Sequence, residues 1–330
     1  MTSTGHPLPA ASHTGGPRDH YIDALKCIAI ALVIATHILG LRREFQGVAP
    51  WAYDFIVSFN MPLFTILSGW VLAGREGTHP GKFLWRKLLA LYVPYFAWIA
   101  VEAPLRKVTL AGMPARLLEA LLNPHAGMQM WFLAVLFWMF VIFTLGRLVS
   151  RSRIWTGALA VAVGAIALLP RITVMSLDKI AWLYPFFILG YLLASARGDR
   201  RVLAWTGAGV ALALGAYALL GGAKLAWLYL VGLGLSAVVA ALYKLLPKRA
   251  IEAQAWLGRR TLGVYGAQMV VLPFLIVGAG WPGALASWAL VLAGATALAF
   301  VLEHTPFTRA VFLGQWPKGK RRSGSTADPV

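Results

Sequence analysis

Long apolar stretches alternate with short polar connections along most of the chain. Each stretch has about the length that a helix needs to cross the hydrocarbon core of a bilayer. The pattern predicts an all-α polytopic membrane protein of about ten transmembrane helices. The expected spans are Ala24–Leu41, Ala52–Ala73, Leu88–Pro104, Met130–Leu148, Ile154–Pro170, Ile180–Ala196, Val202–Leu220, Leu225–Leu246, Leu262–Ala279 and Ala284–Leu302.

Outside the spans, the sequence predicts one short helix and two tails. Met113–Leu122, in the longest connection, has the pattern of an interfacial helix. Residues 1–17 are rich in Pro, Gly, Ser and Thr and residues 318–330 are polar and basic, so neither segment can bury a core. We therefore expect disordered tails on either side of one membrane domain at 18–317.

Composition and charge support this prediction. The chain is 59% hydrophobic and 13% charged, whereas soluble domains carry about 25% charged residues. The net charge of +18 does not indicate nucleic-acid binding, because the basic residues lie between the apolar spans. Alternating the ten spans places 22 of the 30 lysines and arginines on one side. Such a bias marks the cytoplasmic side and predicts cytoplasmic N- and C-termini.

The first span carries three polar side chains in an otherwise apolar sequence, namely Asp23, Lys26 and His37. A helix turns about 100° per residue, so the three share one stripe, and about 16 Å of axis separates Lys26 from His37. Charged groups inside a bilayer normally face a bundle interior or a wet cavity. A core imidazole is the structural alternative for His37. The stripe nevertheless favours a functional site, because a neutral histidine can accept a proton near neutral pH.

Other candidate residues have structural explanations of comparable weight. Pro62 interrupts the second span and Asn60 lies where freed carbonyls need donors, while Ser68 and Gly69 are typical of close helix packing. Arg86 and Lys87 precede the third span and could bind phosphates or simply anchor the helix on the cytoplasmic side. Tyr265 and Gln268 face the same way in the ninth span, and a buried amide needs hydrogen-bond partners.

Six stretches, spread from the first span to the ninth, carry a resemblance to a known family. They are YIDALKCIAIALVIATHI, SFNMPLFTILSGWVL, WRKLLALYVPYF, MWFLAVLF, YPFFILGYLL and TLGVYGAQ. With them the chain resembles the membrane acyltransferase-3 family, and within it the sugar O-acetylases similar to fucose 4-O-acetylase. The first two stretches are the most specific.

The resemblance implies transfer of an acetyl group from cytosolic acetyl-CoA to a hydroxyl, often on a surface sugar. It implies no metal, a sugar or polysaccharide acceptor, polysaccharide-assembly partners, and a location in the bacterial cytoplasmic (inner) membrane. The family pairs a basic residue with a histidine eleven positions later, as Lys26 and His37 do. Arg86 and Lys87 match its basic pair, whereas Ala90 and Gln268 stand where members often carry a basic residue and a histidine.

We therefore expect His37 to act as general base, with Asp23 as a second catalytic candidate on the same stripe. Lys26, Arg86 and Lys87 are expected to bind the acyl donor. Asn60 and Ser68, both in the second span, are candidates for contacts to the oxyanion or the substrate. Two other classes stay open: a transporter or flippase with a proton relay through Asp23, Lys26 and His37, and a non-enzymatic membrane scaffold.

Overall fold

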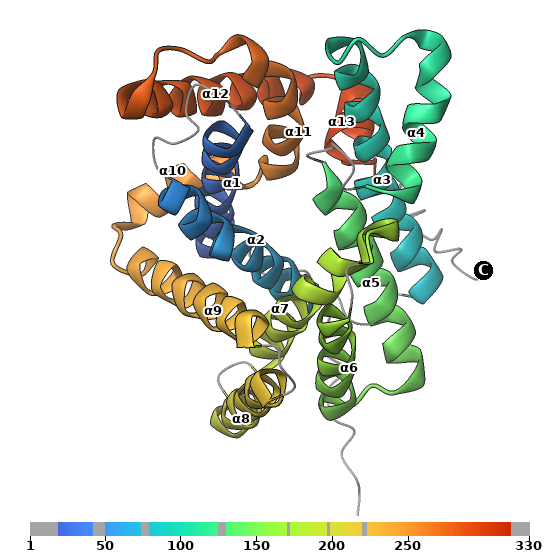
Figure 1. Cartoon of the computed structure of the whole chain (residues 1–330), viewed down its shortest axis with the longest axis vertical. Coiled ribbons are helices and arrows are strands. Elements are labelled where there is room, and N and C mark those ends of the chain that lie inside the picture. The colour runs from blue at the N-terminus through green and yellow to red at the C-terminus, as the bar shows by residue number, and fades with distance from the viewer. Residues whose placement is uncertain are drawn as a thin grey trace, which may run out of the picture.

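The computed structural model describes residues 19–41, 50–73, 79–124, 130–169, 172–196, 199–219 and 223–317. The tails expected at 1–17 and 318–330 lie outside these ranges. Every regular element in the described residues is a helix (Figure 1). The α-helices are α1 His20–Leu41, α2 Pro50–Ala73, α3 Pro80–Leu105, α4 Met113–Leu122, α5 Trp131–Val149, α6 Arg153–Ala165, α7 Leu177–Ala196, α8 Arg200–Leu219, α9 Ala223–Tyr243, α10 Lys248–Gly258, α11 Thr261–Val271, α12 Gly280–Leu302 and α13 Pro306–Leu313, with 3-10 turns at Leu110–Gly112, Ile166–Leu168, Val174–Ser176 and Leu272–Phe274.

Each of the ten expected spans falls on a helix, but the helices differ in apolar length. Seven helices in the described residues are long and apolar enough to cross a membrane: α1, α2, α3, α5, α7, α9 and α12. The other three expected spans fall on shorter apolar stretches, Arg153–Leu168, Thr206–Ala216 and Thr261–Phe274. The chain therefore has the helices of a multi-pass membrane protein, and the count of ten spans remains a prediction.

Three short helices connect or follow the longer ones. Met113–Leu122 forms α4 with the expected bounds. α10 and α13 were not expected, because both are short and amphipathic and lack the apolar length of a membrane span. The start of α13 is nevertheless encoded locally: the Thr305 side chain accepts a hydrogen bond from the Thr308 N–H at 3.1 Å, and Pro306 occupies the first turn.

α1 packs against α2, α10, α11 and α12 (Figure 1). Its contact with α10 requires a glycine, because a Cβ at Gly258 would collide with the backbone carbonyl of Asp23. α10 and the start of α11 are thereby held against the end of α1 that carries Asp23 and Lys26.

α2 and α7 make the most extensive helix pair, and two glycines allow their close approach. A Cβ at Gly69 would collide with the carbonyl oxygen of Phe187, and one at Gly190 with that of Ile66. The expected close-packing point at Ser68-Gly69 is therefore confirmed. α7 runs unbroken from Leu177 to Ala196, although it contains Pro185 and Gly190, residue types that often end or kink a helix. Gly190 serves the contact with α2.

Candidate functional site

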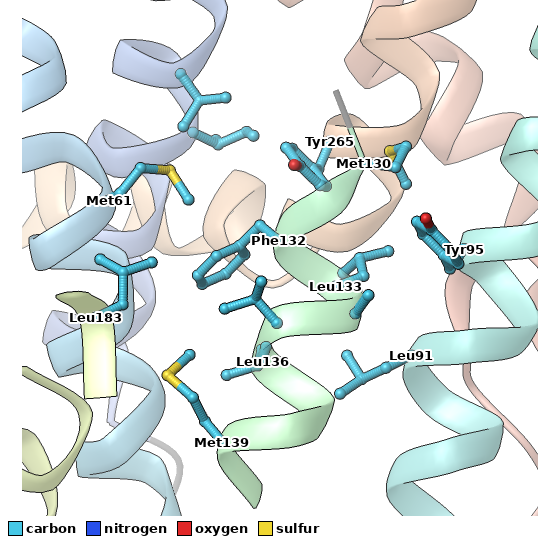
Figure 2. Packing of buried hydrophobic residues seen from close by; sticks show 14 of the residues in the cluster. Met61, Leu91, Tyr95, Met130, Phe132, Leu133, Leu136, Met139, Leu183 and Tyr265 are labelled. Carbon is cyan, nitrogen blue, oxygen red and sulfur yellow. The ribbon is translucent and has the colours of Figure 1, made fainter. Parts of the chain in front are cut away.

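A cavity of about 190 Å³ lies between α1, α2, α3, α5 and the turn from α10 into α11. Its walls are mainly apolar. Figure 2 shows Phe132 and Leu136 on the first half of α5, with Met61 of α2, Leu91 of α3 and Tyr265 of α11 around it. All five of these residues line the cavity.

One end of the cavity is cationic, because Lys26 and Arg259 line it there. Arg259 directly follows Gly258, which is in contact with Asp23. The Lys26 Nζ lies 3.2 Å from Oδ1 of Asp23, which is only 2% exposed. Asp23 therefore holds Lys26 at the cavity. Asp23 precedes His37 by 14 residues, or about 21 Å along the helix, so it does not touch the imidazole. Its expected catalytic role stays a prediction.

The other end of the cavity stops one helical turn short of His37. Val33 lines the cavity from α1, and His37 follows it by four residues on the same face. Tyr265 lines the cavity from α11, and Gln268 follows it by three residues. The site therefore has two layers along α1. Val33 and Tyr265 border the cavity, and His37 and Gln268 form the next layer, further from Lys26.

His37 is half-buried and forms a hydrogen bond with Gln268 within this second layer. Its Nδ1 lies 3.2 Å from Oε1 of Gln268, which is fully buried. The Gln268 Nε2 in turn donates to the carbonyl oxygen of Tyr265 at 3.1 Å. The buried amide that the sequence singled out thus has its partner in the histidine of the first span.

Asn60 and Ser68 occupy different levels of α2. Asn60 is buried beside the His37 layer, where its Nδ2 lies 3.5 Å from Oγ1 of Thr36 and its Oδ1 accepts from the Met61 N–H at 2.6 Å. Ser68, two turns further along, donates to the carbonyl of Phe64 at 2.9 Å. Of the two, only Asn60 lies at the level of His37 along α1, through its contact with Thr36.

Arg86 and Lys87 do not line the cavity. Arg86 is exposed. The Lys87 Nζ lies 3.7 Å from the centroid of the Phe140 ring, a cation–π contact. Lys87 precedes Leu91 by one turn on the same face of α3, and Phe140 follows Leu136 by one turn on α5. Lys87 therefore lies just beyond the part of the wall formed by Leu91 and Leu136, whereas Arg86 points elsewhere.

Sequence reasoning missed Arg259 as a cavity residue. It was visible only as one of several basic residues between two spans. Nothing in its local sequence separates it from Arg260, which forms an ion pair with Glu303 at 2.8 Å instead. In the part of the chain that the structure describes, no cluster of His, Cys, Asp and Glu could hold a metal ion.

Comparison with known proteins adds a family and two relatives. The model of the acyltransferase-3 family, described as an acyltransferase domain, matches residues 19–304. Nodulation protein NolL of Mesorhizobium japonicum is 28% identical over 197 residues, which cover 57% of this chain and 51% of the relative. Nodulation protein NolL of Sinorhizobium fredii is 29% identical over 188 residues, covering 54% and 49%. The chain thus aligns with about half the length of each relative. No solved structure matches it.

Proposed function

Because the chain belongs to the acyltransferase-3 family, we propose that it transfers an acetyl group from cytosolic acetyl-CoA to a hydroxyl of a cell-surface or exopolysaccharide sugar. One observation carries the proposal. A cavity that is cationic at one end leads along a single face of α1 toward a histidine whose Nδ1 is bonded to a neutral amide. Such a site can admit the acyl end of a long anionic donor and place a proton acceptor beyond it.

The cationic end is suited to the phosphates of the donor. Lys26 and Arg259 line it, and Lys87 lies one turn beyond Leu91 at the wall. The cavity volume of about 190 Å³ is below the 300–1,000 Å³ typical of sites that enclose a whole small ligand. The cavity therefore suits a short acyl group and its thioester, while the nucleotide stays outside among the basic residues.

The chemistry assigned to His37 is general-base catalysis of acyl transfer. The imidazole Nε2 takes the proton of the acceptor hydroxyl as its oxygen bonds to the thioester carbonyl carbon. The carbon–sulfur bond then breaks, the carbonyl reforms, and the thiolate leaves with the proton returned by the imidazolium. Asn60, with its long 3.5 Å contact to Thr36, is the candidate donor for the developing oxyanion. Ser68 is too far along α2 for that role and stays a candidate for substrate contact only.

The proposed arrangement in the bacterial inner membrane has ten spans with both termini in the cytoplasm. Lys26 and Arg259 then face the cytosolic donor, and His37 lies in the outer half. α4 and the turns beside it lie on the outer side, where a sugar acceptor would arrive. Polysaccharide-assembly proteins are the proposed source of that acceptor.

A proton-relay transporter is less well supported by the same geometry. A relay needs its groups within hydrogen-bond reach of one another or of bridging water. Asp23 and Lys26 are bonded to each other at 3.2 Å, whereas about 16 Å of helix axis separates Lys26 from His37. A transporter would also move its substrate without consuming acetyl-CoA.

The test uses membrane vesicles of the host strain, which contain the native acceptor. The donor is acetyl-CoA labelled in its acetyl group. The full chain, His37→Ala and Thr156→Val are compared at equal membrane levels. Thr156 is a buried polar residue of α6 that bonds to the Ser152 carbonyl and does not line the cavity. We expect labelled glycan from the wild type and Thr156→Val, and a loss of at least about 100-fold in His37→Ala. Wild-type labelling by His37→Ala would refute the mechanism, and a deletion strain with unchanged glycan O-acetylation would refute the activity.

A further inference from the structure

The orientation of the Gln268 side chain is fixed by its surroundings. The amide is fully buried, and its Nε2 donates to the carbonyl oxygen of Tyr265 one turn earlier on α11 at 3.1 Å. Turning the amide over would place Oε1 against that carbonyl oxygen, two acceptors with no hydrogen between them. Buried polar groups without partners are costly. Oε1 is therefore directed at His37.

This orientation determines which nitrogen of His37 carries the proton. Oε1 of an amide can only accept a hydrogen bond, so Nδ1 of His37, at 3.2 Å, must donate. A neutral imidazole has one N–H, and when that hydrogen is on Nδ1 the lone pair is on Nε2. The hydrogen bond also fixes the plane of the ring.

We propose that Gln268 is a positioning residue for acyl transfer: it holds His37 in the tautomer whose Nε2 can accept the proton of the acceptor hydroxyl. The inference rests on the proposed function and names a second residue of the same site. Gln268 acts through His37 and need not touch either substrate. In its absence both tautomers and several ring orientations become accessible, and only one of them is productive.

The partner of His37 is neutral, and within the described residues His37 has no hydrogen bond to a charged side chain. Asp54 is exposed near the start of α2, and α12 has no charged residue between Gly280 and Leu302. α9 and α10 contact α1 at its Lys26 end, and Tyr265 on α11 lies in the layer below. A carboxylate introduced at position 268 would therefore be the nearest negative charge to the imidazole and would favour its protonated form.

Two variants of matching size test the inference in the same vesicles. Gln268→Met keeps the length but removes the whole amide, whereas Gln268→Glu keeps an acceptor for Nδ1 and puts a negative charge in place of the N–H donated to Tyr265. For Gln268→Met we expect kcat to fall about 10- to 100-fold, because the variant keeps the base but loses its positioning. KM for acetyl-CoA should stay within about twofold of the wild-type value. For Gln268→Glu we expect more activity than Met at high pH, with the acid limb of the kcat–pH profile moved upward by about one unit.

A purely structural role for Gln268 would leave the pH profile in place and lower the amount of inserted protein instead. The inference is overturned if Gln268→Met, inserted at the wild-type level, keeps wild-type kcat, or if Gln268→Glu keeps the wild-type acid limb. His37→Ala separates this failure from failure of the proposed function. An inactive His37→Ala beside a fully active Gln268→Met removes only the positioning role, whereas an active His37→Ala removes both.

Discussion

Val33 lies directly below His37 on α1, four residues and about 6 Å nearer the cationic end of the cavity. Val33 lines the cavity and is 3% exposed, whereas the imidazole lies in the next layer with Gln268. The side chain of Val33 therefore separates the space for an acyl group from the proposed base. Its size is expected to decide which acyl donors bring their carbonyl to the imidazole.

Changing the size of Val33 should change the preference for acyl length. Val33→Ala removes two methyl groups and deepens the cavity, so we expect butyryl-CoA to gain on acetyl-CoA by about 10-fold in relative kcat/KM, the value of one or two methylenes in an apolar pocket. Val33→Phe should fill the space and lower kcat/KM for every donor. Competition between labelled donors measures the ratio.

The matched control for that change is Val291→Ala, which alters a fully buried valine of α12 that does not line the cavity. It should lower stability without changing the ratio of the two donors. If Val33→Ala also leaves the butyryl-CoA to acetyl-CoA ratio unchanged, another part of the protein determines the preference for acyl length.

Arg259 should contribute more to donor binding than Arg86. Arg259 lines the cationic end of the cavity, whereas Arg86 is exposed and does not line it. Hydrogen bonds to charged groups contribute about 1.5–3 kcal/mol, so we expect Arg259→Gln to raise KM for acetyl-CoA about 10-fold or more. Arg86→Gln should change it less than twofold, and kcat should change little in either variant. Equal effects of the two substitutions would contradict the proposal that the donor binds at the cationic end of the cavity.

Much of the helical framework could be predicted from the sequence because it follows from apolar length and local signals. α1 is apolar over the length of a membrane span and α4 has an amphipathic pattern, and the structure places helices at both. The role of Gly190 could not be predicted, because a glycine that breaks a helix and one that admits a neighbouring helix have the same local sequence. Only the position of Ile66 across the interface tells them apart.

The site was predicted only in part, because its decisive contacts join distant segments. The stripe of Lys26 and His37 could be read from helical geometry alone. That the amide of Gln268 meets His37 across 231 positions could not. The catalytic expectation for Asp23 followed from its place on the stripe, but the rise of the helix separates it from His37, and its carboxylate forms an ion pair with Lys26.

Replacing Asp23 by asparagine distinguishes support of Lys26 from catalysis with His37. The carboxylate lies 3.2 Å from the Lys26 Nζ and is almost fully buried. Asp23→Asn removes its charge and should leave Lys26 less well placed, so KM for acetyl-CoA should rise about 5- to 10-fold while the pH dependence of kcat stays as in the wild type. A lower kcat with a shifted acid limb would instead link Asp23 to the imidazole.

A pair of Gly→Ala substitutions tests the packing of α7 on α2. A Cβ at Gly190 would collide with the backbone carbonyl of Ile66, which cannot rotate away as a side chain could. The helices must then separate, and overpacking of this kind costs about 1–3 kcal/mol or more. A Cβ at Gly157, inside α6, meets nothing within 4 Å. There the change should be neutral or stabilise by up to about 1 kcal/mol, because alanine favours the helix.

The measurement for this pair is the thermal midpoint of the detergent-solubilised protein, with the amount inserted in membranes as a second readout. Gly190→Ala should lower both, and Gly157→Ala should lower neither. Because α2 carries Met61 and Asn60 beside the cavity and the His37 layer, loss of the α2–α7 contact should also reduce acyl transfer in the protein that remains folded. Equal midpoints for the two variants would show that α2 and α7 do not approach as closely as their glycines allow.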